Sequence, residues 1–313
     1  MCLFLDRSIY SYCGGTLVQV QGCEGRVARS GKAVDRFVVE VPIEWLKVSP
    51  DGSTVLIFGA KGTRIWRWRD GVGCERFLQA SNTRDILGCG FIAINGSIVT
   101  LVSSDGSLLG LGADDRSLFA SNLRSPHSFA PRAFCQLPGD RLALTGAFFS
   151  DPCDATITVP LNELFNNPDA VQQAIKAKAP VRDRAMDVTV GPCDPGAAVV
   201  LRDPENEEIG DDDDDEHEDR ADVANFAGVY IREFETGRLV ERHPYAGRAG
   251  SGAAIIATTN WIVVQTVGGV DMIQRSTGTV RHVPRAILDV SGAQLAMVRD
   301  HDLTSVTSID SVV

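Results

Sequence analysis

Short hydrophobic runs alternate with turn residues along this chain, and the plan repeats roughly every 40 residues. The clearest unit, residues 43–80, has predicted strands at Ile43–Val48, Thr54–Phe58 and Arg64–Trp68, with the turn Ser49-Pro50-Asp51-Gly52 after the first. In the third run, Ile65 and the arginines alternate with two tryptophans, and this period of two indicates a strand. A four-stranded repeat of this length is typical of a β-propeller blade.

Turn residues allow other segments to be aligned with this unit. Asn95-Gly96 and Asp105-Gly106 predict tight hairpins, because these residue types tolerate positive φ. The chain up to Pro42 holds strands for a further unit, and the part after Ala286 holds three strands. The second strands of successive units are aligned on the anchor residues Thr54, Ser97, Arg141, Ala197, Trp261 and Gln294.

We therefore predict an all-β fold, a single β-propeller domain over residues 1–313 with six or seven four-stranded blades, and we favour seven. We expect the terminal segments to share or adjoin one blade, which removes free sheet edges that promote aggregation. No run approaches the roughly 20 apolar residues of a membrane span, and Met1–Arg7 lacks a basic leader. The sequence predicts a cytoplasmic or nuclear protein that does not bind membranes.

One short helix is predicted in an insertion at residues 160–180. Asn167 and Pro168 suit its N-cap and first turn. An apolar stripe follows, formed by Ala170, Val171, Ala174 and Ile175. The stripe suits docking on the propeller itself or on a partner. The basic residues Lys176, Lys178, Arg182 and Arg184 form a candidate partner-binding patch beside it.

A second insertion, residues 203–222, is strongly acidic. It holds thirteen Asp and Glu residues against one Arg, so it accounts for nearly all of the net charge of −11. We expect a flexible, disordered loop, because carboxylates repel one another and no apolar residue anchors the stretch after Gly210. It is either a solubilising loop or a binding site for a basic protein. The candidate partner-binding residues are Asp211, Asp212, Asp213, Asp214, Asp215 and Glu216.

No group of side chains marks a catalytic or metal site. The eight cysteines include no C-x-x-C pair, and the five histidines are isolated. Arg299-Asp300-His301-Asp302 is interpreted as a polar hairpin turn. Charged residues predicted on innermost strands, such as Glu44, Lys47 and Asp187, do not recur at equivalent blade positions. We predict no catalytic residue, no cofactor and no metal.

The units at residues 43–80, 89–119 and 186–241 resemble degenerate WD repeats. Val48-Ser49-Pro50-Asp51-Gly52 matches the turn between the first two strands of that family, and residues 62–68 match its third strand. The Trp-Asp pair that usually ends this strand is absent. The resemblance implies a propeller fold. Residues 9–20 also resemble the opening of the WD-repeat, non-catalytic subunit of the tRNA guanine-N7 methyltransferase.

The sequence predicts a non-catalytic scaffold that mediates protein–protein interactions in a larger complex. One alternative is a non-catalytic subunit of a tRNA guanine-N7 methyltransferase complex, which would meet RNA only indirectly or as part of that complex. Another is a propeller enzyme with its active site at the mouth of the ring. Arg64, Arg67 and Arg69 flank two tryptophans and form a candidate RNA or partner surface, unless they are ordinary strand residues packed between blades.

Overall fold

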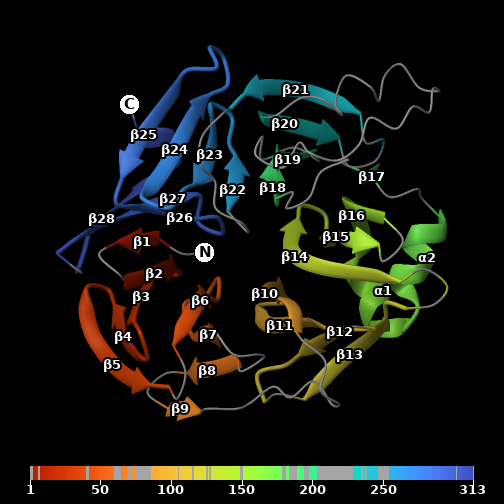
Figure 1. The fold of residues 1–313 in the computed structure, drawn as a ribbon, viewed down its shortest axis with the longest axis horizontal. Coiled ribbons are helices and arrows are strands. Elements are labelled where there is room, and N and C mark those ends of the chain that lie inside the picture. Colours follow the sequence, from red (N-terminus) through yellow and green to blue (C-terminus); the bar gives the residue numbers. More distant parts are fainter. Residues whose placement is uncertain are drawn as a thin grey trace.

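The structure is a computed structural model in which antiparallel sheets are arranged in a ring (Figure 1). We number the sheets as blades 1 to 7 in chain order. It describes residues 3–5, 8–39, 42–59, 65–69, 72–74, 86–104, 106–114, 116–124, 126, 128–148, 151–177, 181–182, 189–193, 197–202, 228–233, 236, 238–245, 254–300 and 302–312.

The turns predicted at residues 49–52 and 95–96 are confirmed in blades 2 and 3. Asn95 and Gly96 both adopt positive φ between the first two strands of blade 3. Blade 1 contains β1 (Leu3–Leu5), β2 (Ser8–Cys13), β3 (Thr16–Gln21), β4 (Glu24–Arg29) and β5 (Lys32–Val38). Blade 2 contains β6 (Ile43–Val48), β7 (Thr54–Gly59), β8 (Ile65–Arg69) and β9 (Val72–Cys74). Blade 3 contains β10 (Ile86–Ile94), β11 (Ser97–Ser104), β12 (Ser107–Leu111) and β13 (Ser117–Asn122).

The next three blades also have four strands each, and one parallel bridge between Cys193 and Ala257 joins blades 5 and 6. Blade 4 contains β14 (Phe129–Leu137), β15 (Arg141–Phe148), β16 (Asp151–Pro160) and β17 (Val181–Arg182). Blade 5 contains β18 (Thr189–Cys193), β19 (Ala197–Arg202), β20 (Gly228–Glu233) and β21 (Leu239–Pro244). Blade 6 contains β22 (Ile255–Ala257), β23 (Trp261–Gln265), β24 (Gly269–Gln274) and β25 (Val280–Pro284).

Blade 7 ends the ring with β26 (Ala286–Asp289), β27 (Gln294–Arg299) and β28 (Asp302–Ser308), followed by a 3₁₀ turn at Ile309–Ser311. The β-propeller fold and the favoured count of seven are thus confirmed over the described residues. Two blades depart from four strands, since blade 1 has five and blade 7 has three. All six anchor residues of the predicted second strands are the first residues of β7, β11, β15, β19, β23 and β27.

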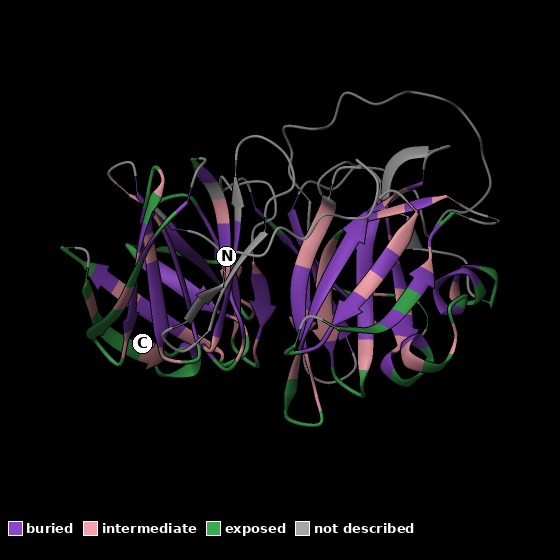
Figure 2. Cartoon of the chain, turned by 90° about the horizontal axis from the view of Figure 1, so that it is seen from below, coloured by how far each residue is buried: buried purple, intermediate pink, exposed green. Residues whose placement is uncertain are grey.

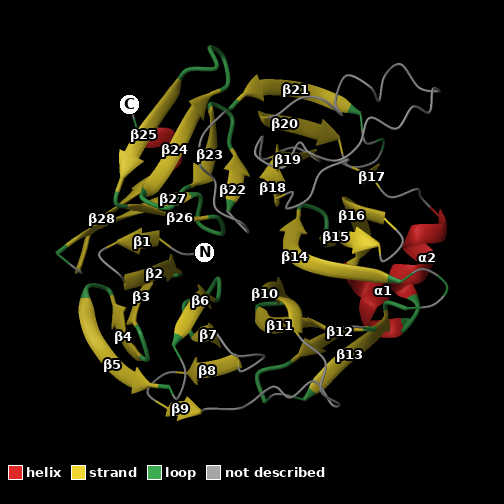
Figure 3. Cartoon of the chain, viewed as in Figure 1, coloured by secondary structure: helices red, strands yellow, loops and turns green. Residues whose placement is uncertain are grey.

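The inserted helix is confirmed, and the structure adds a second one. The helices α1 (Leu161–Asn166) and α2 (Ala170–Ala177) follow β16, outside the ring and beside β13 (Figure 3). The predicted cap residue Asn167 ends α1, and its side chain accepts a hydrogen bond from the Asp169 amide at 3.0 Å before α2 begins. An Asx turn therefore separates two short helices where the sequence predicted one.

Hydrophobic packing between blades forms the core, and the buried residues follow the strands (Figure 2). The described residues contain seven buried hydrophobic clusters, and each lies between one pair of neighbouring blades or, in one case, also beneath the helices. One of them joins the two ends of the chain, because Leu3, Tyr10 and Leu17 of blade 1 pack against Ile287 and Val298 of blade 7. The ring is therefore closed by side chains between adjoining terminal blades, which remain separate sheets.

Polar contacts support this closure. The buried carboxylate of Asp289 accepts hydrogen bonds from the amides of Ser291 and Gly292, at 3.1 and 3.2 Å. The Cys13 thiol of blade 1 donates to the same Asp289 oxygen at 3.1 Å. Arg26 also lies 3.3 Å from Asp302, although both side chains of this ion pair are exposed enough to make it weak. Buried hydrogen bonds from both terminal blades thus meet at one carboxylate.

Outer strands carry a shared irregularity. One extra residue forms a bulge in β5, β13 and β21, and these residues, Val34, Leu118 and Val240, are exposed. Thr304 is the extra residue of a similar bulge in β28, the outermost strand of blade 7. Bulges twist an edge strand and hinder pairing with another chain. Blade 7 therefore ends in a strand of the outer type although it lacks a fourth strand.

Antiparallel strands place successive turns on alternate faces of the ring. We call one face the helix face, because it carries the turns after first and third strands, including α1 and α2. In blade 1 the count starts at β2, since β1 is an additional strand and the β2–β3 turn lies beside the β6–β7 turn of blade 2. The opposite face, which we call the tract face, carries the turns after second strands. Residues 203–227 connect β19 to β20 there, and their flanking residues Arg202 and Gly228 are paired across the two strands. The acidic insertion thus starts and ends at adjacent strand ends.

Gly14 and Gly15 offer a matched test of how tightly neighbouring turns interlock on the helix face. Both adopt positive φ, +53° and +78°. A Cβ on Gly14 would lie 2.5 Å from the Gly52 nitrogen and the Pro50 oxygen, whereas a Cβ on Gly15 would meet nothing within 4 Å. Gly15→Ala should lower the free energy of unfolding by about 1 kcal/mol, the cost of its backbone conformation. Gly14→Ala should cost about 3 kcal/mol, because backbone atoms must also move. Equal losses in denaturant titrations would contradict this packing.

Candidate functional site

Three inner strands bring Lys47 of β6 close to blades 3 and 4. A Cβ on Gly90 of β10 would lie 3.5 Å from the Lys47 Nζ and 3.2 Å from the Phe134 Cδ2 of β14. Blade 3 lies between blades 2 and 4, and the strands β6, β10 and β14 of these blades border the middle of the ring (Figure 1). We call Lys47, Cys89, Gly90, Phe134 and Cys135 the axial site.

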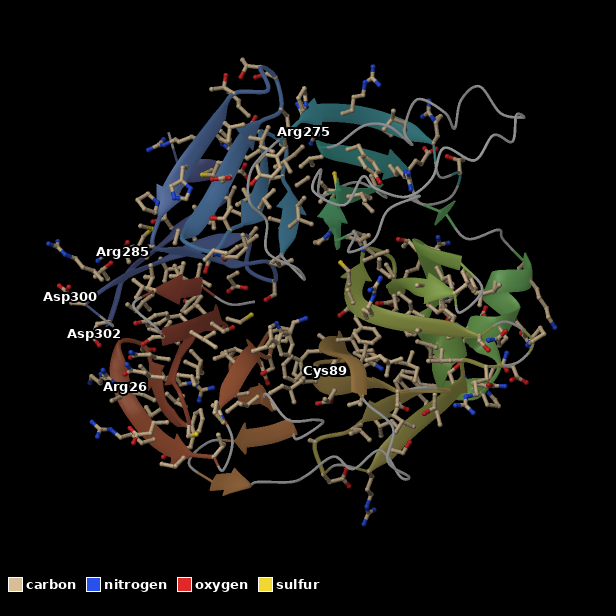
Figure 4. The ribbon with its side chains drawn as sticks, in the orientation of Figure 1. Arg26, Cys89, Arg275, Arg285, Asp300 and Asp302 are labelled. Atoms are coloured by element: carbon tan, nitrogen blue, oxygen red, sulfur yellow. The ribbon has the colours of Figure 1, made fainter. Side chains whose placement is uncertain are left out.

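The thiols of the axial site are neutral and lie near the lysine. Figure 4 shows Cys89 where β10 borders the middle of the ring. Burial raises the pKa of Cys89 to about 12, and the positive charge of Lys47 opposes that rise. Burial likewise raises the pKa of Cys135 to about 12, again against the effect of Lys47. Both cysteines are free and remain partly exposed. Neutral thiols are poor nucleophiles, so the pair does not form a reactive cysteine site at neutral pH.

A second polar group links blades 5 and 6. The buried Tyr245 hydroxyl donates to the Asp271 Oδ2 at 2.6 Å, and the His282 Nδ1 lies 2.7 Å from the Asp271 Oδ1. An Asp beside a His can orient a general base, but both Asp271 oxygens are engaged here, and no described nucleophile is bonded to the ring of His282. The geometry fits a connection between blades better than catalysis.

The outer ends of the same two blades are joined by an ion pair. Arg275 of blade 6 contacts Glu241 of β21 through Nη2 at 2.6 Å and also donates to the Thr258 carbonyl at 2.7 Å. The buried His243 lies 2.5 Å from the other Glu241 oxygen. Partial burial acts to raise the pKa of Glu241, but the hydrogen bonds from Arg275 and His243 outweigh it and lower the pKa below its ordinary value. The hydrogen bond to Glu241 raises the pKa of Arg275.

Many of the residues singled out by the sequence fall outside the described residues. These are Arg64, Lys178, Arg184 and the acidic residues Asp211, Asp212, Asp213, Asp214, Asp215 and Glu216. The candidate surface of Arg67 and Arg69 lies in β8, where they pair with Leu56 and Thr54 of β7. The structure describes only the backbone of these two arginines.

Two residues of the candidate basic patch lie in described elements. Lys176 is an exposed residue in the last turn of α2 on the helix face. Arg182 follows the insertion in β17, where its backbone pairs with Ala155 of β16. Lys176 and the acidic insertion therefore attach to opposite faces.

The apolar stripe of α2 packs on its own propeller. Ala170, Val171 and Ile175 are buried in one cluster with Leu161 and Leu164 of α1, and Ala174 packs against that cluster. Of the two roles considered for this stripe, docking on the propeller is the one observed. Substitutions there would disturb the packing of blades 3 and 4, so they do not offer a clean test of partner binding.

The sequence predicted only part of the axial site. Lys47 could be placed on an innermost strand, together with Glu44 and Asp187, but Asp187 and the Glu44 side chain lie outside the described residues. The cysteines were expected to be mostly buried. Of the five whose side chains are described, Cys13 and Cys193 are buried, and Cys23, Cys89 and Cys135 are intermediate. The pattern of a single strand does not reveal which neighbours a side chain meets across the ring.

Over the described residues, no group of three His, Cys, Asp or Glu side chains is arranged to hold a metal ion. In the same part of the chain, no helix has the length and apolar character needed to cross a membrane. The hairpin interpretation of residues 299–302 is confirmed, since Arg299 pairs with Asp302 and Asp300 adopts a φ of 50° in the turn.

Comparisons with known proteins support the fold. No protein-family model and no curated protein sequence matches this chain. It is similar to a structure of Kuenenia stuttgartiensis hydrazine synthase, with 13% identity, a TM-score of 0.58, and coverage of 96% of this chain and 95% of that one. It is also similar to the dihydro-heme d1 dehydrogenase NirN in complex with DHE, with 11% identity, a TM-score of 0.54, and coverage of 95% and 65%. At these identities the likeness concerns the fold alone.

The contribution of Glu241 to stability should depend on pH. Because its pKa is lowered in the folded protein, the stabilisation is present above the unfolded pKa, about 4.3, and is lost as the pH falls through the folded value. Glu241→Gln should therefore reduce the free energy of unfolding by about 1–2 kcal/mol near pH 7. The difference from the native protein should shrink below about pH 4. Glu24→Gln, at an exposed position of β4, is the control and should change little. A difference that persists unchanged to pH 2–3 would contradict the charge-based explanation.

Proposed function

We propose that this chain is a non-catalytic β-propeller scaffold that holds protein partners in a larger complex and binds a basic partner through its acidic insertion. The observation that carries the proposal is the way this insertion is attached. Its flanking residues Arg202 and Gly228 are paired across β19 and β20, two central strands of blade 5. Thirteen acidic residues between Asp203 and Asp222 are thus tethered at both ends to one place on the tract face.

The rest of the ring is suited to support such a site. Val199 and Val229, in the two flanking strands, are fully buried between blades 5 and 6. The contacts of Arg275 with Glu241 and of Tyr245 with Asp271 join the same two blades. A polyanion attached to a well-packed sheet is held at one place on the ring. Its charges attract a basic segment over the screening length, which is about 8 Å at physiological salt.

Removal of the charge should weaken partner binding. In the test variant, the five residues Asp211–Asp215 are replaced by Asn and Glu216 by Gln, so that the length is kept. Basic partners that co-purify with the native chain should bind this variant more weakly, with a flatter dependence of affinity on salt. The melting temperature should stay almost unchanged. Partners retained with the same affinity and salt dependence would contradict a role for the acidic insertion.

A more specific form of the scaffold proposal comes from the resemblance of residues 9–20 to the non-catalytic subunit of the tRNA guanine-N7 methyltransferase. These residues form the hairpin of β2 and β3 in blade 1. Under this proposal a methyltransferase subunit would co-purify with the chain, and tRNA would bind the pair but not the isolated chain. Substrate turnover by the purified chain alone would contradict both forms.

A further inference from the structure

The axial site contains a partly buried charge that lacks a partner. The Lys47 ammonium forms no hydrogen bond or ion pair with any residue in the described ranges, and it is only partly accessible to solvent. Two other charged groups between blades have partners, since Glu241 pairs with Arg275 and Asp289 accepts several hydrogen bonds. Charged groups that lose water without gaining a partner are costly, so they are normally paired.

The neighbours of Lys47 do not neutralise it. The Cys89 and Cys135 thiols, with pKa values of about 12, carry no negative charge at neutral pH. Gly90 has no side chain that could pair with the Lys47 ammonium. Phe134 contributes only the edge of its aromatic ring. The Cys135 thiol already donates to the Gln136 carbonyl at 3.5 Å. The surroundings therefore combine one positive charge, one weak donor in the Cys89 thiol, and an apolar wall, a set of groups that complements a small anion.

We propose that Lys47 anchors an oxyanion, the carboxylate or phosphate group of a small ligand, on the inner side of the ring between blades 2, 3 and 4. The ammonium supplies the charge-assisted hydrogen bond to the anion. This site lies on the inner side of the ring and uses none of the residues assigned to the basic partner, so either proposal can fail without the other.

Calorimetric titration with inorganic phosphate and, separately, with succinate tests the site. The native chain should bind at least one of these anions saturably, and the one that binds identifies the source of the oxyanion. Lys47→Met should weaken binding by about tenfold or more, whereas Lys47→Arg should keep a measurable part of it. Lys32→Met makes the same change of charge at an exposed position of the outer strand β5 and should alter the dissociation constant less than about twofold.

Thiol alkylation gives an independent measurement on the native chain. The anion that binds should slow the reaction of iodoacetamide with Cys89 and Cys135, followed by mass spectrometry of their peptides, but not the reaction with Cys23 of blade 1. The absence of saturable binding by both anions would overturn the proposal. Unchanged anion binding by a Lys47→Met variant that melts at the same temperature as the native chain would also overturn it. A third contradicting result is an anion that slows alkylation of all three thiols equally.

Discussion

Packing of each blade against the next is the constraint on which the rest of this structure depends. A twisted sheet buries its apolar residues only if another layer covers them. Here each of the seven buried clusters lies between neighbouring blades. Six of these interfaces join blades that follow one another along the chain, while the seventh must join its two ends. Without the seventh, the apolar faces of blades 1 and 7 would both meet water.

The terminal interface combines apolar burial with a specific polar contact. Leu3 and Tyr10 are almost fully buried against Ile287, and the Asp289 carboxylate receives hydrogen bonds from both blades. Blades 3 and 4 are also joined by a polar contact. The Gln136 side chain of β14 forms two hydrogen bonds of 2.8 Å with the backbone of Ala93 in β10. Satisfied buried polar groups fix how the apolar faces align. A ring fixed in this way can hold sites on its faces and on its inner side while the turns vary.

Much of the fold could be read from local pattern, because strand starts and tight turns are set by nearby residues. The starts of β7, β15 and β27 were correct to the residue. The strand β4 was missed, since Glu24–Arg29 contains only Val27 and Ala28 as strongly apolar residues and resembles a polar turn. The helix α1 was missed because its six residues show too few turns for a helical period to be recognised.

The candidate sites depend on contacts between distant residues, which local pattern predicts less well than it predicts strands and turns. The stripe of α2 was recognised, but the surface it packs on follows from the tertiary structure. Lys47 could be assigned to an inner strand, whereas its proximity to Cys89 and Cys135 arises only when three blades are arranged in a ring. The role of Asp289 was not anticipated either, since its partner Cys13 is 276 residues away.

Native-state hydrogen exchange of Asp289→Ala tests the closure of the ring most directly. If contacts between the terminal blades complete the structure, loss of this carboxylate should raise amide exchange in β2 and β3 of blade 1 as well as in β26 and β27 of blade 7. The strands β10–β12, across the ring, should keep their protection except as far as the global stability falls. Faster exchange confined to the β26–β27 turn, with blade 1 unchanged, would contradict the account.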